Sequence, residues 1–259
     1  MACAIIQARM SSTRLPGKVL KPIGTRPMLS YLIERVTAAK MLDKIILATS
    51  KTSEDDSIAK YCTENGILHF RGDLDDVLDR YYQTAKAFGC QHIVRLTSDC
   101  PVVDPLVIDS IMEIYNAGSF DYVANTCPPE GFSYPDGMDV EVFSMAMLEK
   151  AWMEARKPSE REHVTFYFWK NPDIFSTFRH DLEKDLSNYR LTVDYPEDFE
   201  VISRIISHLY PQNPLFSMQD IIKYLEANPE VKSLNANIQP FQGWASAIEK
   251  DRKTGVDET

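Results

Sequence analysis

The chain has 259 residues, 44% of them hydrophobic and 25% charged, which suits one large α/β domain or two small ones. Its 28 basic residues against 38 acidic ones leave a formal net charge of −10. A chain this acidic, with no basic stripe, is a poor candidate for wrapping duplex nucleic acid, whose binding requires neutralisation of phosphates. A small anion is still a suitable partner, because it needs only a local cluster of cations.

Neither the N-terminus nor the cysteines indicate export or a membrane partner. The first ten residues have no basic n-region, and their apolar run is too short for a signal peptide or a membrane span. The cysteines are odd in number and far apart, without a Cys-x-x-Cys pair. This pattern argues against a disulfide framework and a zinc site, and it favours the reducing cytosol. The five are Cys3, Cys62, Cys90, Cys100 and Cys127.

Short apolar runs alternate with helical patterns along the first half of the chain. Buried strands are predicted at residues 4–6, 44–48, 67–70 and 92–96. Apolar residues recur at helical spacing between them, at residues 29–36 and 74–85, and again after Asp104-Pro105. Repetition of this kind predicts right-handed βαβ units and a mostly parallel sheet with helices on both faces.

The second half of the chain is less regular. A loop rich in Pro and Gly is predicted near residues 125–136, then a strand, two helices, two strands and two further helices. The ranges are 138–143, 144–156, 159–170, 174–179, 189–193, 199–209 and a last helix opening at Ser217. Ser159 and Glu162 have the spacing of a capping box. We interpret residues 1–239 as one domain with a small inserted lobe at about 125–185, followed by a loose polar tail at 240–259.

A cationic loop follows the first strand. Arg9, Arg14 and Lys18 lie within ten residues of one another, with Ser, Thr and Gly between them. In an open α/β sheet the loops at the carboxyl ends of the strands line the ligand crevice. Guanidinium groups, an ammonium and backbone amides suit a polyphosphate there. The pattern is neither a P-loop nor a Gly-x-Gly-x-x-Gly fingerprint, so the alternative to a polyphosphate site is a solvated basic loop.

Two segments of the chain echo each other. Residues 95–101 and 190–196 share Arg, Leu, Thr, Asp and Pro at matching positions, which places Asp99 and Asp194 just past the ends of two predicted strands. Two carboxylates at one edge of a sheet are suited to share a hard divalent cation that also binds phosphates. The alternative is that each Asp only caps the helix that follows it.

Two further patterns suggest contacts with a second substrate. At strand spacing, Gly137, Asp139 and Glu141 point to one side, where they could bind sugar hydroxyls, a basic group or a metal, or simply face solvent. Arg161 and His163 lie near a helix start, where they could meet an anionic acceptor. For His163, an ordinary half-buried polar position is the alternative.

Taken together, these segments resemble the cytidylyltransferase family that includes 3-deoxy-manno-octulosonate and N-acylneuraminate cytidylyltransferases. The resemblance is strongest to the branch of spore-coat polysaccharide biosynthesis proteins and spans about residues 4–200. It is carried by residues 5–18 (IIQARMSSTRLPGK), 47–50 (LATS), 71–73 (RGD), 96–101 (LTSDCP), 136–141 (DGMDVE), 161–165 (REHVT) and 192–194 (TVD).

The resemblance implies a GT-A-like nucleotide-binding fold, a homodimer formed by the inserted lobe, and a Mg²⁺-dependent transfer of CMP from CTP to a small acidic acceptor. Lys18, Arg14 and Asp99 would be catalytic, and Asp99 and Asp194 would hold magnesium. The acceptor would meet Asp139, Glu141, Arg161 and His163. The nucleotide-binding residues would be Ala8, Arg9, Ser11, Arg14, Gly17, Lys18, Ala48, Thr49, Ser50, Arg71, Thr97 and Ser98.

Two departures from the family pattern leave the acceptor open. The octulosonate enzymes carry Gly-Asp-Glu-Pro where this chain has Ser-Asp-Cys-Pro, and Phe166 stands where this branch would have Pro. GTP, or a phosphosugar or phosphonate acceptor, would fit the same chemistry. A GT-A glycosyltransferase is a rival, but its Asp-x-Asp motif has only Asp73-Leu74-Asp75 as an approximation, at a predicted helix start. A catalytically inactive nucleotide-binding module is the alternative of another class.

Overall fold

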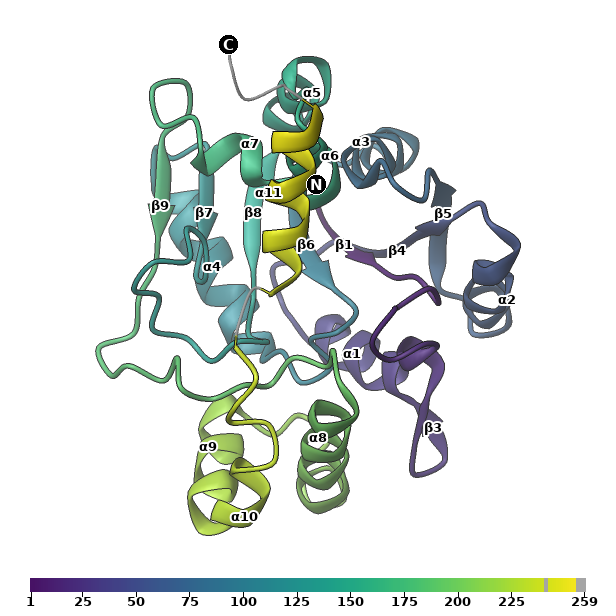
Figure 1. Ribbon diagram of the computed structural model, residues 1–259, viewed down its shortest axis with the longest axis vertical. Helices are drawn as coiled ribbons and strands as arrows, with labels where there is room; N and C mark the ends of the chain where they lie inside the picture. Colours follow the sequence, from purple (N-terminus) through teal and green to yellow (C-terminus); the bar gives the residue numbers. More distant parts are fainter. Residues whose placement is uncertain (240–241, 255–259) are drawn as a thin grey trace.

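The computed structural model describes residues 1–239 and 242–254, and its centre is a seven-stranded sheet in the order β5-β4-β1-β6-β8-β7-β9 (Figure 1). Strands β5, β4, β1 and β6 are parallel, β8 runs antiparallel to both β6 and β7, and β9 is parallel to β7. The mostly parallel α/β fold is therefore confirmed. The strands are β1 (Ala2–Gln7), β4 (Lys44–Ser50), β5 (Leu68–Gly72), β6 (His92–Thr97), β7 (Tyr122–Ala124), β8 (Glu141–Ser144) and β9 (Thr177–Arg179).

Helices cover both faces of this sheet, as the alternation of elements predicts (Figure 1). A small hairpin, β2 (Pro22–Ile23) with β3 (Arg26–Pro27), and two short 3-10 helices at Lys18–Leu20 and Ser53–Asp55 lie outside it. The helices are α1 (Met28–Thr37), α2 (Asp56–Glu64), α3 (Val77–Phe88), α4 (Pro105–Ala117), α5 (Met145–Glu154), α6 (Pro158–His163), α7 (Phe166–Trp169), α8 (Pro196–Leu209), α9 (Met218–Ala227), α10 (Pro229–Lys232) and α11 (Gln242–Thr254).

The central strand β1 is buried on both faces because its alternate side chains enter two different cores. Ala4 and Ile6 pack with the apolar faces of α1, α4, α8 and α9. Cys3 and Ile5 pack on the opposite side with α3, α5 and α7. A strand buried on both faces needs a continuous apolar run, and β1 has one. The sheet edge that carries the loop after β1 is thereby held rigidly from both sides.

The segment predicted as an inserted lobe, residues 125–185, is built onto the main sheet. Strand β8 pairs directly with β6, and β9 extends the far edge beyond β7. The predicted strand at 189–193 does not form; that stretch makes one isolated bridge, between Arg190 and Asp136. These residues instead run beside the loop at 136–137, next to the site described below.

The helix predicted at 159–170 is split in two. Helix α6 ends at His163, because the next residue, Val164, has a φ of 53° that breaks the helical path, and α7 starts at Phe166. The predicted capping box of Ser159 and Glu162 is wrong. The helix starts at Pro158, and the carboxylate that accepts from the preceding backbone N–H groups belongs to Glu160.

The predicted loose tail contains a helix instead. Helix α11 covers Gln242–Thr254 and packs against α6, and in Figure 1 it runs in yellow along the front of the sheet. The Asp251 carboxylate accepts from the backbone N–H of Ser159 at 2.8 Å, and Lys250 lies 2.9 Å from Glu162. Residues 240–241 and 255–259 of the predicted tail lie outside the described residues.

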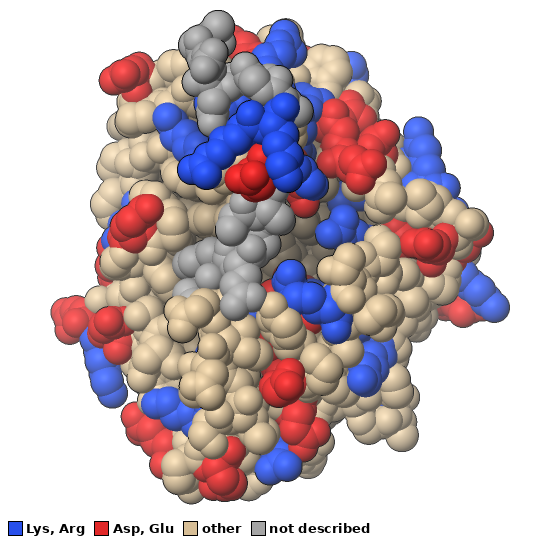
Figure 2. Space-filling model, viewed as in Figure 1, with Lys and Arg blue, Asp and Glu red and all other residues tan. Residues whose placement is uncertain are grey.

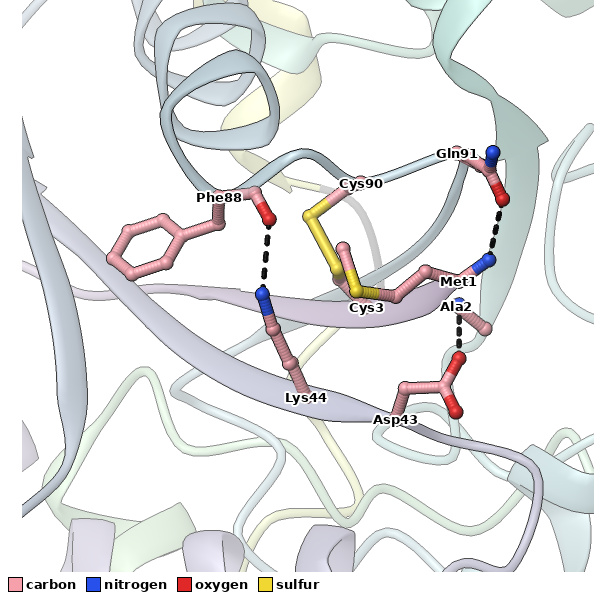
Figure 3. Close-up of a disulfide and its surroundings, with 8 residues drawn as sticks. All are labelled: Met1, Ala2, Cys3, Asp43, Lys44, Phe88, Cys90 and Gln91. Carbon is pink, nitrogen blue, oxygen red and sulfur yellow. Dashed lines mark hydrogen bonds between the residues drawn. A yellow bond between two sulfur atoms is a disulfide. The ribbon is translucent and has the colours of Figure 1, made fainter.

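Cys3 and Cys90 form a disulfide across 87 residues of sequence, with Cα atoms 5.8 Å apart (Figure 3). The expectation that the cysteines stay unpaired is wrong for this pair. β1 and β6 pair in parallel with Ala2 opposite His92, which brings Cys3 close to Cys90, two residues before β6 begins. Sequence spacing alone could not reveal this. Cys62, Cys100 and Cys127 are buried free thiols. Among the described residues, no helix has the length and apolarity needed to cross a membrane.

Candidate active site

A cleft of about 740 Å³ opens where β1 and β6 end and the antiparallel β8 begins. Figure 2 shows this face hollowed near its middle, with basic side chains gathered around the hollow. The cleft brings together most of the residues that the sequence singles out. Its lining includes Ala8, Arg9, Arg14, Lys18, Thr97, Ser98, Asp99, Asp139, Glu141, Arg161, His163 and Asp194.

Lys18 is held between the two aspartates of the echoed segments. Its Nζ lies 3.3 Å from Asp99 Oδ2 and 3.0 Å from Asp194 Oδ1, and it donates to the carbonyl oxygen of Val193 at 2.6 Å. The residue is only 7% exposed. Gly17, with φ 69°, turns the chain so that Lys18 enters this position. Lys18 and Asp194 are 176 residues apart in the sequence, and the fold brings them within hydrogen-bonding distance.

The charges of this centre stabilise one another. Burial by itself lowers the pKa of the Lys18 ammonium, but the charges of Asp99 and Asp194 outweigh burial, and the pKa is raised. Burial raises the pKa of Asp99, but the charge of Lys18 and the hydrogen bonds to Asp99, from Thr97 and Lys18 among others, together lower it. Both groups are therefore ionised at neutral pH, and the centre is a preformed set of alternating charges.

Backbone contacts fix the spacing of the two aspartates. The carbonyl oxygen of Asp99 accepts from the backbone N–H of Val193 at 2.8 Å and from Thr192 Oγ1 at 3.3 Å. Gly137 packs against the same segment so closely that a Cβ atom there would lie 2.4 Å from the carbonyl carbon of Leu191. Only glycine is compatible with this approach and with a φ of 106°.

Two arginines form ion pairs with Asp194. Arg14 lies 3.0 Å from Asp194 Oδ1, and Arg190 lies 3.4 Å from Asp194 Oδ2 while also binding Asp136 at 2.6 Å. The helix α8 is capped by Asp198, which accepts from the N–H groups of residues 194 and 195. Helix α4 is capped by Asp104. The alternative that Asp99 and Asp194 serve as helix caps is therefore wrong.

Glu141 belongs to a buried network instead of facing solvent. It is 2% exposed, forms an ion pair with Arg95 on the neighbouring strand, and accepts from Tyr122 Oη and Thr165 Oγ1, each at 2.7 Å. Asp139 accepts from Thr126 Oγ1 and from Gly137 N–H, each at 2.7 Å. Burial raises the pKa of Asp139. Both carboxylates line the cleft, and Glu141 is already bound by Arg95, Tyr122 and Thr165.

Arg161 and His163 reach the cleft from α6. Arg161 is tied to Asp76, the N-cap of α3, and donates to the carbonyl oxygen of Trp152 at 2.8 Å. The His163 ring stacks on Phe166 with 4.6 Å between ring centroids, and its Nε2 is buried without a hydrogen-bond partner among the described residues. Burial lowers the pKa of His163 to about 4, so the ring is neutral at physiological pH.

The predicted base-binding turn is not assembled at the cleft. Ala48, Thr49 and Ser50 are fully buried in β4. Arg71 donates to the carbonyl oxygens of Ser50 and Thr52, at 2.9 and 2.8 Å, and pairs with Asp56. These four residues, with Ser11 and Gly17, are absent from the described lining of the cleft.

Sequence reasoning overlooked several residues of the cleft. Arg95 and Arg190 are the first residues of the two echoed segments, so the echo itself was the signal for them. Arg80 on α3 carried no signal beyond helical spacing. Trp244 on α11 also lines the cleft and packs edge-on against Phe166, with ring centroids 4.8 Å apart.

The fold is the nucleotidyltransferase fold seen in solved cytidylyltransferase structures. A family model described as "Cytidylyltransferase" matches residues 3–223. The chain belongs to the cytidylyltransferase family, and the resemblance seen in the sequence is confirmed.

Individual relatives of the chain are consistent with this family. The spore coat polysaccharide biosynthesis protein SpsF of Bacillus subtilis (strain 168) is 34% identical over 235 residues, 87% of this chain and 94% of that protein. A 3-deoxy-manno-octulosonate cytidylyltransferase of Synechococcus elongatus is 34% identical over 116 residues, 44% of this chain and 47% of its own. The solved structure of a cytidylyltransferase from Leptospira borgpetersenii serovar Hardjo-bovis (strain JB197) superposes with a TM-score of 0.83 at 35% identity, covering 93% of this chain and 98% of that one.

Proposed function

We propose that this protein transfers CMP from CTP to a small acidic acceptor, an ulosonic acid or related sugar, and releases pyrophosphate. The observation that carries the proposal is the buried Lys18 ammonium between Asp99 and Asp194, at the floor of a cleft with Arg9 and Arg14 on its wall. A cation flanked by two carboxylates at the carboxyl edge of the sheet suits a substrate that brings both phosphates and a divalent ion.

The two aspartates fit the Mg²⁺ that such a reaction uses. Both offer carboxylate oxygens, the ligands that Mg²⁺ prefers, and both lie against the same Nζ atom. Because Mg²⁺ has octahedral coordination, two carboxylates would leave room for phosphate and water ligands. When bound, Mg²⁺ would neutralise charge that develops on the leaving phosphates.

In the proposed step, an oxygen of the acceptor attacks the α-phosphorus of CTP in line with the leaving group. A new P–O bond joins CMP to the acceptor, the bond to the β-phosphate oxygen breaks, and pyrophosphate leaves with its electron pair. The acceptor proton passes to water. Lys18 and Arg14 would stabilise the negative charge that grows on the leaving group, because they are fixed in place before the reaction.

The acceptor would occupy the half of the cleft between β8 and α6. Asp139 there accepts only from neutral donors among the described contacts, which suits hydrogen bonds from sugar hydroxyls. His163 is buried and neutral, so it could form a hydrogen bond with the acceptor without placing a charge beside it. The similarity to SpsF, a spore coat polysaccharide biosynthesis protein, supports a product used in polysaccharide synthesis. A homodimer and a cytosolic location stay predictions.

The test is pyrophosphate release by the purified protein with Mg²⁺, using CTP, GTP, UTP and ATP against ulosonic acids, sugar phosphates and phosphonates. We expect release with CTP and an ulosonic acid. Release with GTP, or with a phosphosugar or phosphonate, would support the same chemistry with other substrates. Tight CTP binding without turnover on any acceptor would favour the inactive nucleotide-binding module.

A further inference from the structure

Helix α11 forms part of the cleft although it lies outside the segment that the family model matches. The match covers residues 3–223, whereas α11 covers Gln242–Thr254. Trp244 and Lys250 of this helix both line the cleft. Figure 1 shows α11 beside α6, the helix that borders the acceptor half of the cleft. This half therefore contains side chains that the matched part of the chain does not supply.

One face of α11 fixes the helix against α6. Trp244, Ala247 and Asp251 have the spacing of a single helical face. Ala247 is fully buried, and Asp251 is 3% exposed. The Asp251 carboxylate accepts from the backbone N–H of Ser159, in the first turn of α6, at 2.8 Å. The position of the Trp244 side chain is therefore set by the packing of one helix on another.

The Trp244 indole belongs to an aromatic cluster at the junction of α6 and α7. Its ring centroid lies 4.8 Å from that of Phe166, 5.9 Å from that of Trp169 and 6.1 Å from that of His163. Trp244 is partly exposed, and it lines the cleft together with His163 and Phe166. The indole therefore offers an apolar surface to the cleft, beside a residue that is predicted to meet the acceptor.

The charged side chains that α6 and α11 bring to this end of the cleft are paired within the protein. Arg161 pairs with Asp76, and Lys250 lies 2.9 Å from Glu162. Burial lowers the pKa of His163 to about 4, so this ring is neutral at physiological pH. Ion pairs that are already neutralised, next to neutral rings, favour contact with an uncharged and apolar part of a ligand.

We propose that α11 completes the acceptor half of the cleft and that Trp244 is a specificity-determining residue, whose indole takes an apolar C–H surface of the acceptor. This inference rests on the proposed function, because it requires an acceptor beside the nucleotide. An indole buries a large apolar area and adds no charge. Acceptors that present carbon-bound hydrogens to α11 are therefore favoured over acceptors that place a carboxylate or phosphate there.

The experiment measures pyrophosphate release with Mg²⁺ and compares two KM values, for 3-deoxy-manno-octulosonate and for CTP, in the wild type and in Trp244→Ala. Should another member of the acceptor panel be the better substrate, its KM is compared in the same way. We expect Trp244→Ala to raise the acceptor KM about 10-fold, as for loss of one aromatic contact, and the KM for CTP less than about twofold. Trp244→Phe keeps a ring and should recover most of the affinity.

Two further variants of α11 serve as comparisons. Ile248→Ala is the matched control, since Ile248 is 36% exposed and is absent from the described lining of the cleft. It should leave both KM values unchanged. Lys250→Met tests charge against apolar contact, and it should raise the acceptor KM less than Trp244→Ala does. A larger rise would show that charge recognises the acceptor at this end, which would overturn the proposal.

An unchanged acceptor KM in folded Trp244→Ala, or equal rises in both KM values, would overturn the role of Trp244 and leave the proposed function standing. Should Trp244→Ala fail to fold, Trp244→Leu keeps an apolar side chain in the aromatic cluster, and the same comparison of KM values decides. A wild type that releases no pyrophosphate with any acceptor would refute the proposed function, and this inference with it.

Discussion

The backbone carbonyl of Asp99 accepts a hydrogen bond from the backbone N–H of Val193 at 2.8 Å. With the bond from Thr192 Oγ1 to the same oxygen, this contact joins the two echoed segments, one after β6 and the other before α8. It places Asp99 and Asp194 on opposite sides of the Lys18 ammonium. The proposed catalytic centre therefore depends on backbone packing between distant parts of the chain.

Gly137→Ala tests this packing. The new Cβ atom would lie 2.4 Å from the carbonyl carbon of Leu191, and φ at 106° is unfavourable for alanine. We expect destabilisation of more than about 3 kcal/mol and loss of turnover, measured by denaturant unfolding and a rate assay. Gly66→Ala is the control, since φ is 66° there but no atom lies within 4 Å, and it should cost about 1 kcal/mol. Equal effects of the two substitutions would contradict the packing argument.

Lys18→Met tests the centre itself. Removal of the ammonium leaves Asp99 and Asp194 without their shared cation, so we expect the rate to fall at least about 10²- to 10³-fold while the fold is kept. Asp99→Asn should have a comparable effect. Lys21→Met, which removes a nearby lysine that lies over the Phe199 ring, should stay active. Near-normal turnover in folded Lys18→Met would show that the lysine is not part of the chemistry.

The cationic loop and the two aspartates could be predicted because their signals are local. Lys18 lies in one continuous motif, and the Asp99 and Asp194 segments repeat the same residues. The partner of Glu141 could not be found in this way, since Arg95 meets it only through the antiparallel register of β6 and β8. The predicted capping box failed because the helix begins at Pro158, before the predicted cap Ser159, so that Glu160 and not Glu162 is the third residue of the helix.

Glu141→Gln separates charge from shape in the buried network. The amide keeps an oxygen for Tyr122 and Thr165 but leaves the Arg95 charge unpaired. We expect a loss of about 3 kcal/mol in unfolding free energy, and part of it should return in the double variant with Arg95→Gln. Glu200→Gln breaks an exposed pair with Arg204 and should cost less than about 0.5 kcal/mol. Similar costs at the two sites would argue against a buried ion pair.

His163 predicts a pH dependence of stability. Burial lowers its pKa in the folded protein to about 4 from an ordinary 6.5, so the unfolded chain takes up a proton over a range where the folded protein does not. Stability should therefore fall as the pH drops from about 6.5 to about 4, by about 3 kcal/mol at most. Glu162, Glu141, Arg95 and Lys170 are the charged groups that influence this ring.

His163→Phe is the matched variant, since it keeps a ring against Phe166 and removes the titrating nitrogen. Urea unfolding at pH 7 and pH 4.5 should show a smaller loss of stability in the variant than in the wild type. The same loss in both proteins would place the acid sensitivity elsewhere.

The most direct measurement is ³¹P NMR of the protein with CTP, Mg²⁺ and an ulosonic acid. The account predicts that the triphosphate signals are replaced by those of pyrophosphate and of one new phosphodiester, and that Lys18→Met forms neither. Cleavage to CDP and inorganic phosphate, or a phosphodiester formed equally well by Lys18→Met, would contradict it.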